Sequence, residues 1–223
     1  MKKMLIITGP QGSGNHIFSR LLSLHEDVAG WEEILDDYWI PSDQAPFANY
    51  FINPELLTAE EFSKKDFHLV GTSCPFFFNG VRAIPKIVEF AKKAASFGID
   101  VQIAIIVRDQ NINRVQQERV RGIHTTPLAQ DYYYKELIPA GFPVHFLDHE
   151  AFFLHKGYYL KWVSDITGFP IAYDSPDLMK FITIDANSKY VTPIKEYWLD
   201  TLAHAGCKPT LDERMGASAD KQV

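Results

Sequence analysis

Two kinds of hydrophobic pattern alternate along the chain. Mostly apolar runs occupy residues 4–8, 67–72, 101–107 and 144–147, and each is short and bounded by glycine or polar residues. These runs predict strands, and the continuous apolar run over residues 4–8 predicts a strand that is buried on both faces, as in a parallel sheet. Between the runs lie longer segments in which apolar residues recur every three or four positions, which predicts amphipathic helices.

The predicted helices separate the predicted strands. They cover residues 15–24, 84–97, 112–121, 128–138 and 150–167. Residues 34–62 are rich in aromatic residues, proline and aspartate without a clear period, so we expect short helices and loops there. Strands that alternate with helices indicate parallel βαβ units. The predicted fold class is therefore α/β, a three-layer α/β/α arrangement with a central, mainly parallel sheet.

Composition and charge limit the classes of function. Of 223 residues, 46% are hydrophobic and 22% charged, which predicts one globular domain over residues 1–208 and a polar, fraying tail over 209–223. The net charge of −6 gives no overall attraction to nucleic acid or an anionic membrane, so neither partner is expected. Cys74 and Cys207 lack metal-binding spacing, and no run resembles a signal peptide or membrane span, so we expect a cytoplasmic protein.

A glycine-rich loop carries the clearest chemical signal. The segment Gly9-Pro-Gln-Gly-Ser-Gly-Asn15 follows the first predicted strand and opens the first predicted helix. Glycines let the backbone amides converge, and the helix dipole adds about half a positive charge, so a phosphate of the P-loop nucleotide-binding type is the expected occupant. A tight turn without a ligand is the alternative. The expected phosphate contacts are Gly9, Gln11, Gly12, Ser13, Gly14, Asn15 and His16.

The loop departs from the ATP-binding pattern at two positions. That pattern, G-x-x-x-x-G-K-[ST], would place lysine at Asn15 and serine or threonine at His16. The lysine bridges the terminal phosphates and the hydroxyl binds magnesium, so their absence argues against phosphoryl transfer from a nucleoside triphosphate. A nucleotide or nucleoside kinase with a decayed loop remains an alternative.

The loop and three later segments together resemble the sulfotransferase family. Residues 22–28 look like the "LxxHPDV" stretch of carbohydrate sulfotransferases, and residues 105–109 like the family's "vvRdP" segment. Residues 144–150, with the helix that leads to Gly168-Phe-Pro170, look like the pattern "vhfvryEdL … lG.p". The resemblance extends from about Met4 to Pro170 and depends on the order and spacing of the segments.

This resemblance implies a donor, a reaction and a second anion site. The donor would be 3′-phosphoadenosine 5′-phosphosulfate, and the acceptor a hydroxyl or amine of a small molecule or carbohydrate, with no metal required. Arg108 would bind the 3′-phosphate, although a surface ion pair with Asp109 or another carboxylate is the alternative. Gln116 stands where the family has a phosphate-binding serine, and Asn113 and Gln116 are the candidate donors in its place. Lys189 lies where the family has a late loop that closes over the nucleotide.

Two catalytic residues of the family are replaced in this sequence. Gly12 stands where many sulfotransferases have a lysine or arginine, and Ser73 where the cytosolic branch has a catalytic histidine. Carbohydrate-type members use a glutamate near the positions of Glu32 and Glu33, so either residue is a candidate general base. The alternative is that both are solvated acidic residues at the start of a helix. His16 is the candidate replacement for the loop cation.

Several other residues have both functional and structural interpretations. Glu150 is predicted to cap or orient the long helix, and the histidines near it show no metal-ligand spacing, so no metal is expected. The aromatic runs 76–78 and 132–134 either line an acceptor cleft or pack in the core. A non-catalytic nucleotide-binding protein that keeps the fold is the third functional hypothesis, after the sulfotransferase and the kinase.

Overall fold

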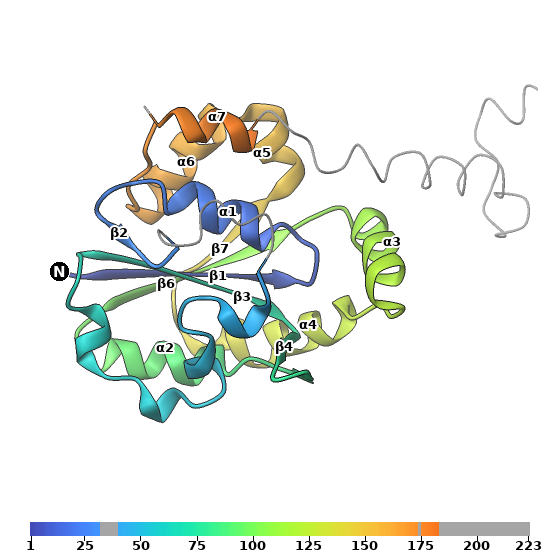
Figure 1. The fold of residues 1–223 in the computed structure, drawn as a ribbon, viewed down its shortest axis with the longest axis horizontal. Helices are drawn as coiled ribbons and strands as arrows, with labels where there is room; N and C mark the ends of the chain where they lie inside the picture. Colours follow the sequence, from blue (N-terminus) through green and yellow to red (C-terminus); the bar gives the residue numbers. More distant parts are fainter. Residues whose placement is uncertain (32–39, 174, 183–223) are drawn as a thin grey trace, which may run out of the picture.

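A five-stranded parallel sheet forms the centre of the protein. The computed structural model describes residues 1–31, 40–173 and 175–182 (Figure 1). The strand order is β2-β3-β1-β6-β7, and all four strand pairings are parallel. The strands are β1 (Lys3–Pro10), β2 (Val28–Ala29), β3 (Phe67–Cys74), β6 (Asp100–Val107) and β7 (Val144–Asp148). The predicted parallel α/β sheet is confirmed.

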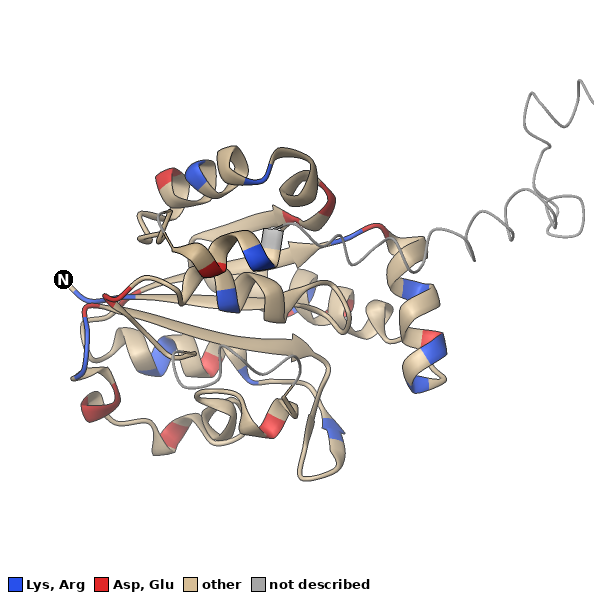
Figure 2. Cartoon of the chain, turned by 45° about the horizontal axis from the view of Figure 1, so that its top comes forward, with Lys and Arg blue, Asp and Glu red and all other residues tan. Residues whose placement is uncertain are grey.

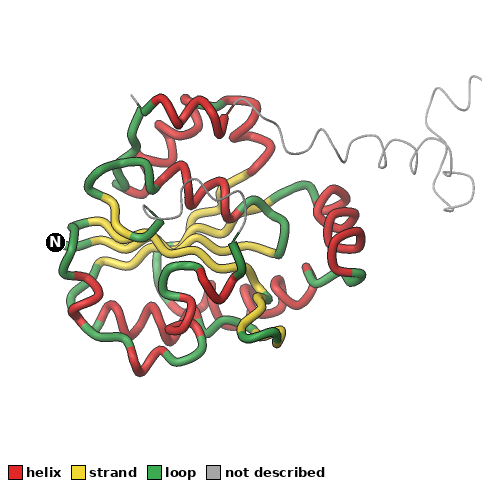
Figure 3. Tube along the Cα trace, viewed as in Figure 1, coloured by secondary structure: helices red, strands yellow, loops and turns green. Residues whose placement is uncertain are grey.

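Helices cover both faces of this sheet (Figures 1 and 3). One layer contains α1 (Asn15–Leu22), α5 (His149–His155), α6 (Gly157–Thr167) and α7 (Pro176–Ile182). The other layer contains α2 (Ile87–Ala95), α4 (Thr126–Tyr132) and the short helices η1 (Ser42–Gln44), η2 (Ala48–Phe51), η3 (Pro54–Leu56) and η4 (Ala59–Phe62). Helix α3 (Gln110–Arg121) lies beyond the carboxyl ends of the strands (Figure 1).

The alternation of side chains along β1 divides the core into two clusters. Leu5 and Ile7 pack beneath α1, whereas Met4 and Ile6 pack against α2. All four are at most 1% exposed, because a parallel sheet has helices on both faces. This double coverage explains why the strand is a continuous apolar run and does not alternate with polar residues.

The sequence analysis missed a small hairpin. Strands β4 (Phe76–Phe78) and β5 (Val81–Ala83) pair antiparallel across Asn79-Gly80, whose φ angles are 50° and 75°. An Asn-Gly pair between short hydrophobic runs is a hairpin signal, since both residues tolerate positive φ. Helix α2 then begins at Ile87, three residues later than predicted, because Pro85 disfavours helical geometry at the residue before it.

The helix predicted over residues 150–167 is wrong, because it is two helices. The chain breaks between α5 and α6 at Lys156, which has φ 48° and ψ −116°. The break lets Phe152 and Leu160 both enter the core cluster that lies beneath α1. The helix predicted over 128–138 is likewise divided, into α4, a π-helical turn η5 (Tyr133–Leu137) and a 3₁₀ turn η6 (Ile138–Ala140).

Charged side chains are distributed over the helices and connections of this fold. Figure 2 shows basic and acidic residues interspersed along the helices, whereas the strands carry few of either. Among the described residues, no helix is long and apolar enough to cross a bilayer. The predicted tail, 209–223, lies outside the described residues.

Candidate functional site

The glycine loop connects β1 to α1 at the carboxyl edge of the sheet. The N-cap residue of α1 is Gly14, with φ 107°, and it offers no side-chain hydrogen bond to the helix; no acidic residue lies in the first turn. The first amides of a helix have no acceptor within the helix, and they form the positive end of its dipole. The start of α1 therefore has the geometry and the partial charge of an anion site.

Neighbouring elements pack tightly against the loop glycines. A Cβ atom on Gly12 would lie 2.5 Å from Oε1 of Gln116, and one on Gly14 would lie 2.5 Å from Cδ2 of His149. Both glycines also have positive φ angles, of 84° and 107°. The loop thus requires glycine for its backbone conformation and for the close approach of α3 and α5.

Side chains within the loop brace it from inside. The Ser13 hydroxyl donates to Oδ1 of Asn15 over 3.0 Å, and Nδ2 of Asn15 donates to the Gly9 carbonyl over 3.2 Å and to the Ser73 hydroxyl over 3.0 Å. Asn15 occupies the position of the lysine in the ATP-binding pattern, but its side chain turns inward and ties the loop to the end of β3. This arrangement disfavours a contact of Asn15 with terminal phosphates.

Arg108 reaches the loop from the end of β6, the strand next to β1. Its side chain is 3% exposed. Its Nη1 donates to the Gly12 carbonyl over 2.5 Å and to Oε1 of Gln116 over 2.8 Å. Arg108 and Gln116, the two positions predicted to form the second anion site, are therefore in direct contact beside the glycine loop.

Glu150 is the carboxylate nearest to this arginine in the described contacts. Its Oε1 lies 4.0 Å from Nε of Arg108, and its Oε2 accepts a hydrogen bond from the Asp109 amide over 3.1 Å. Asp109 caps α3, since its Oδ1 accepts from the Ile112 amide over 2.9 Å. Glu150 thus connects the start of α5 to the start of α3, in agreement with the orienting role predicted for it.

A buried amide network beneath α3 also holds the loop. Gln117 is 0% exposed; its Nε2 donates to the Gln11 carbonyl over 2.6 Å and its Oε1 accepts from the Thr125 amide over 2.6 Å. Asn113 is 2% exposed and directs its Nδ2 to Thr126 Oγ1 at 3.5 Å, so its predicted role as a phosphate donor stays a prediction. The sequence analysis missed Gln117, although it lies one helical turn after Asn113 on α3.

His16 lies in the first turn of α1, with its ring 5.3 Å from the Trp31 ring. Burial, together with the nearby positive charges of Arg20 and Arg121, lowers its pKa to about 4. The imidazole is therefore neutral at pH 7. A neutral ring can accept a proton or a hydrogen bond, but this finding disfavours the prediction that His16 replaces the missing loop cation.

Three predicted site residues cannot be placed. Glu32, Glu33 and Lys189 lie outside the described residues. Within the described ranges, no three His, Cys, Asp or Glu side chains gather as they would around a metal ion. The roles predicted for these residues therefore stay predictions.

Three of the six aromatic residues in runs 76–78 and 132–134 are buried in the core. Phe76, Tyr132 and Tyr133 are at most 6% exposed. The Tyr133 hydroxyl lies 3.1 Å from Thr8 Oγ1, and burial raises the pKa of Tyr133 well above its usual value. The Tyr132 hydroxyl accepts from the Ile87 amide over 3.0 Å. Core packing therefore explains these three side chains, and Phe77 and Tyr134 are exposed.

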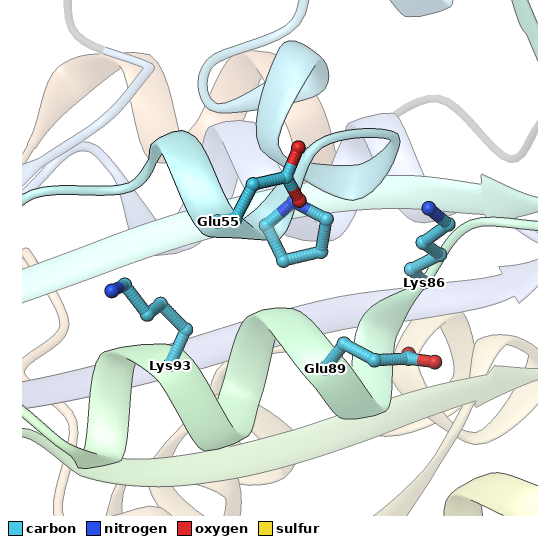
Figure 4. A pocket seen from close by; sticks show the side chains of 5 residues that line it. Glu55, Lys86, Glu89 and Lys93 are labelled. Carbon is cyan, nitrogen blue, oxygen red and sulfur yellow. The ribbon is translucent and has the colours of Figure 1, made fainter.

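The hollows in the described part of the protein include a surface groove and a narrow cleft. A surface groove between η3 and α2 is lined by Pro54, Glu55, Lys86, Glu89 and Lys93, whose charges are of both signs (Figure 4). A narrow cleft lies instead beside the glycine loop, between α1 and the end of β3. Because α2 covers the face of the sheet opposite α1, only the second hollow adjoins the loop.

Comparisons with known proteins find matches among solved structures. No protein-family model and no curated protein sequence matches the chain. A solved structure that matches is the mouse sulfotransferase SULT7A1 complexed with PAP, with a TM-score of 0.40 and 11% sequence identity. The match covers 82% of this chain and 63% of that one. At this level of likeness, no residue role is transferred from that protein.

Proposed function

We propose that this protein transfers a sulfuryl group from 3′-phosphoadenosine 5′-phosphosulfate to a hydroxyl or amine of a small-molecule or carbohydrate acceptor. The observation that carries this proposal is the contact of Arg108 with both Gly12 and Gln116. These three residues come from different elements, and the motif resemblance had assigned them to the binding of one nucleotide. Their convergence at the uncapped start of α1 supports two adjacent anion sites.

The two phosphates of the donor would use different groups. The 5′-phosphate would accept hydrogen bonds from the first amides of α1, and the 3′-phosphate would bind Arg108 together with Gln116. A dianion competes well with the Gly12 carbonyl for the guanidinium, because hydrogen bonds between charged partners are roughly twice as strong as neutral ones. Lys189 would add a further positive charge from the late loop of the family pattern.

The reaction needs a group that accepts a proton, but it does not need the lysine that bridges terminal phosphates in the ATP-binding pattern. The acceptor oxygen or nitrogen forms a bond to sulfur while the bond between sulfur and the bridging phosphate oxygen breaks. The electron pair of the broken bond leaves with 3′-phosphoadenosine 5′-phosphate, and the acceptor's proton passes to a base. Glu33, Glu32 and the neutral imidazole of His16 are the proposed bases. The inward-facing side chain of Asn15 favours this chemistry over that of a kinase.

Isothermal titration calorimetry with 3′-phosphoadenosine 5′-phosphate, and separately with ATP and magnesium, tests the proposal. We expect the former to bind more tightly, and Arg108→Ala to weaken its binding by about 10- to 100-fold, as removal of a charged hydrogen bond implies. Arg114→Ala is the control, because Arg114 is an exposed arginine on α3, the helix that follows Arg108, and it pairs with Glu118. Gln116→Ala is a second, half-buried perturbation that leaves the contact of Arg108 with Gly12 in place.

Transfer of radiolabelled sulfur from the donor then separates the remaining hypotheses. Turnover on a hydroxyl or amine supports the enzyme. Tight binding of the nucleotide without turnover on any acceptor would support the non-catalytic alternative. A preference for ATP with magnesium, unaffected by Arg108→Ala, would contradict the proposal.

A further inference from the structure

A buried histidine borders the start of α1, where the glycine loop ends. His149 is the first residue of α5 and is 1% exposed. A Cβ atom on Gly14, the N-cap residue of α1, would lie 2.5 Å from Cδ2 and 3.2 Å from Nε2 of its ring. The Cδ2–Nε2 edge of the imidazole therefore lies against the first turn of α1, whose amides form the positive end of the helix dipole.

The opposite edge of this imidazole is buried without a hydrogen bond. Nδ1 of His149 has no hydrogen-bond partner among the described residues, and Oε1 of Glu150 lies 3.7 Å from it, which is too long for a hydrogen bond. Buried polar groups in native proteins normally pair with protein, water or a ligand. An unpaired, buried imidazole at the start of an uncapped helix therefore indicates that its partner is a ligand of that helix start.

Glu150 links this histidine to Arg108. The same oxygen, Oε1, lies 3.7 Å from Nδ1 of His149 and 4.0 Å from Nε of Arg108. The other oxygen accepts a hydrogen bond from the Asp109 amide over 3.1 Å, which fixes the carboxylate between the two basic side chains. A carboxylate in this position can pair with an imidazolium ion that forms beside it.

A dianion at the start of α1 needs more positive charge than the loop supplies. The helix dipole provides about half a charge, and residues 9–15 contain no lysine or arginine. The His16 ring, with a pKa of about 4, is neutral at pH 7. Arg108 already donates to the Gly12 carbonyl and to Gln116. A second cation beside the loop would therefore stabilise a bound dianion, and His149 lies at the right place.

The described contacts surround the ring with one negative and one positive group. Phe153 packs on it with ring centroids 4.9 Å apart, and the contact from α1 is to Gly14, so neither of these neighbours is ionisable. The ionisable neighbours are Glu150 on α5 and, through its carboxylate, Arg108 at the end of β6. A dianion that draws Arg108 towards itself would leave the carboxylate to pair with a protonated His149.

We propose that His149 is an anion-binding residue of the glycine-loop site and takes up a proton from solvent when a dianion binds at the start of α1. The protonated ring directs Nδ1–H towards Glu150 and Nε2–H towards the anion. The identity of that anion as a nucleotide phosphate rests on the proposed function, whereas the response of His149 to an anion does not. Anion affinity should fall as the pH rises through the titration of this ring, because the neutral imidazole lacks the charge.

NMR titration of the histidine rings, with inorganic sulfate as the probe, tests this response directly. Sulfate stays a dianion between about pH 5 and 9, so any titration seen there belongs to the protein. The chain has eight histidines, and His149→Gln identifies the relevant signal by its loss. Saturating sulfate should raise the midpoint of the His149 titration by about 1, relative to sodium chloride of equal ionic strength, which means a tenfold preference for the protonated ring.

A second histidine of the same helix is the internal control. His155 is exposed at the end of α5, so sulfate should leave its midpoint unchanged. The measurement uses the wild-type protein, and His149→Asn identifies the signal if His149→Gln does not fold. Glu150→Gln retains an acceptor for the Asp109 amide but removes the charge, so it should lower the His149 midpoint both with and without sulfate.

Nucleotide binding provides a second readout. The ratio of wild-type to His149→Gln affinity for 3′-phosphoadenosine 5′-phosphate cancels the titration of the ligand itself. This ratio should be about tenfold at low pH, where the wild-type ring is protonated, and should approach one above the His149 midpoint measured with the ligand bound. His155→Gln is the matched variant, and its ratio to wild type should stay near one at every pH.

The outcomes separate this inference from the proposed function. An unchanged His149 midpoint in sulfate overturns the inference, and so does an equal rise at His155, which would indicate a general effect of the salt. A rise at His149 alone in a protein that prefers ATP with magnesium defeats only the proposed function. Tight, Arg108-dependent binding of 3′-phosphoadenosine 5′-phosphate with an unchanged His149 midpoint overturns only the present inference.

Discussion

Replacing Gln117 should uncouple α3 from the glycine loop at a large cost in stability. The side chain is completely buried and makes two 2.6 Å hydrogen bonds, one to the Gln11 carbonyl and one from the Thr125 amide. Gln117→Leu preserves much of the volume but leaves both backbone groups unpaired. At about 1–3 kcal/mol for each buried unsatisfied group, the free energy of unfolding should fall by about 3 kcal/mol.

Urea denaturation and thermal unfolding measure this loss. For a domain of this size, about 3 kcal/mol corresponds to a decrease in Tm of about 6–12 °C. Gln110→Leu is the control, since Gln110 is exposed at the start of the same helix and should change stability by less than about 0.5 kcal/mol. If the two variants lose equally little, the network beneath α3 does not hold the loop as described. Nucleotide affinity should fall in Gln117→Leu as well, because Gln11 belongs to the loop.

Two further predictions concern titration and backbone strain. The pKa of His16 is lowered from 6.5 to about 4, so the unfolded chain binds this proton at a higher pH than the folded chain does. The free energy of unfolding should therefore rise by about 3 kcal/mol as the pH increases from about 4 to 6.5. Urea midpoints measured across this interval should rise less in His16→Gln than in the wild type. Lys156 has φ 48° and ψ −116°, a backbone conformation that glycine adopts more easily than residues with a side chain. Lys156→Gly should therefore raise the free energy of unfolding by about 1 kcal/mol. Because alanine keeps the Cβ atom, an equal gain in Lys156→Ala would show that backbone strain is not the cause.

The order of strands and helices could be predicted from local patterns. The apolar runs at β1, β3 and β6 are continuous because helices cover both faces of the sheet there, so the burial of these strands is reflected in their composition. The run at β7 also formed a strand, but β7 ends the described sheet and Phe146 is 51% exposed. The break at Lys156 could not be predicted, since both flanking segments have helical periodicity. It is decided by the packing of Phe152 and Leu160 against the same core cluster.

Some features of the candidate site could likewise be predicted from the sequence, whereas others depend on the tertiary structure. The sequence by itself determined a glycine loop at a helix start and an arginine at a strand end, because both depend on neighbours along the chain. Only the tertiary structure decided that Arg108 binds the Gly12 carbonyl and that Gln117 supports Gln11. These two contacts join residues that are 96 and 106 positions apart, and hydrophobic periodicity carries no information on which buried polar groups meet across such distances.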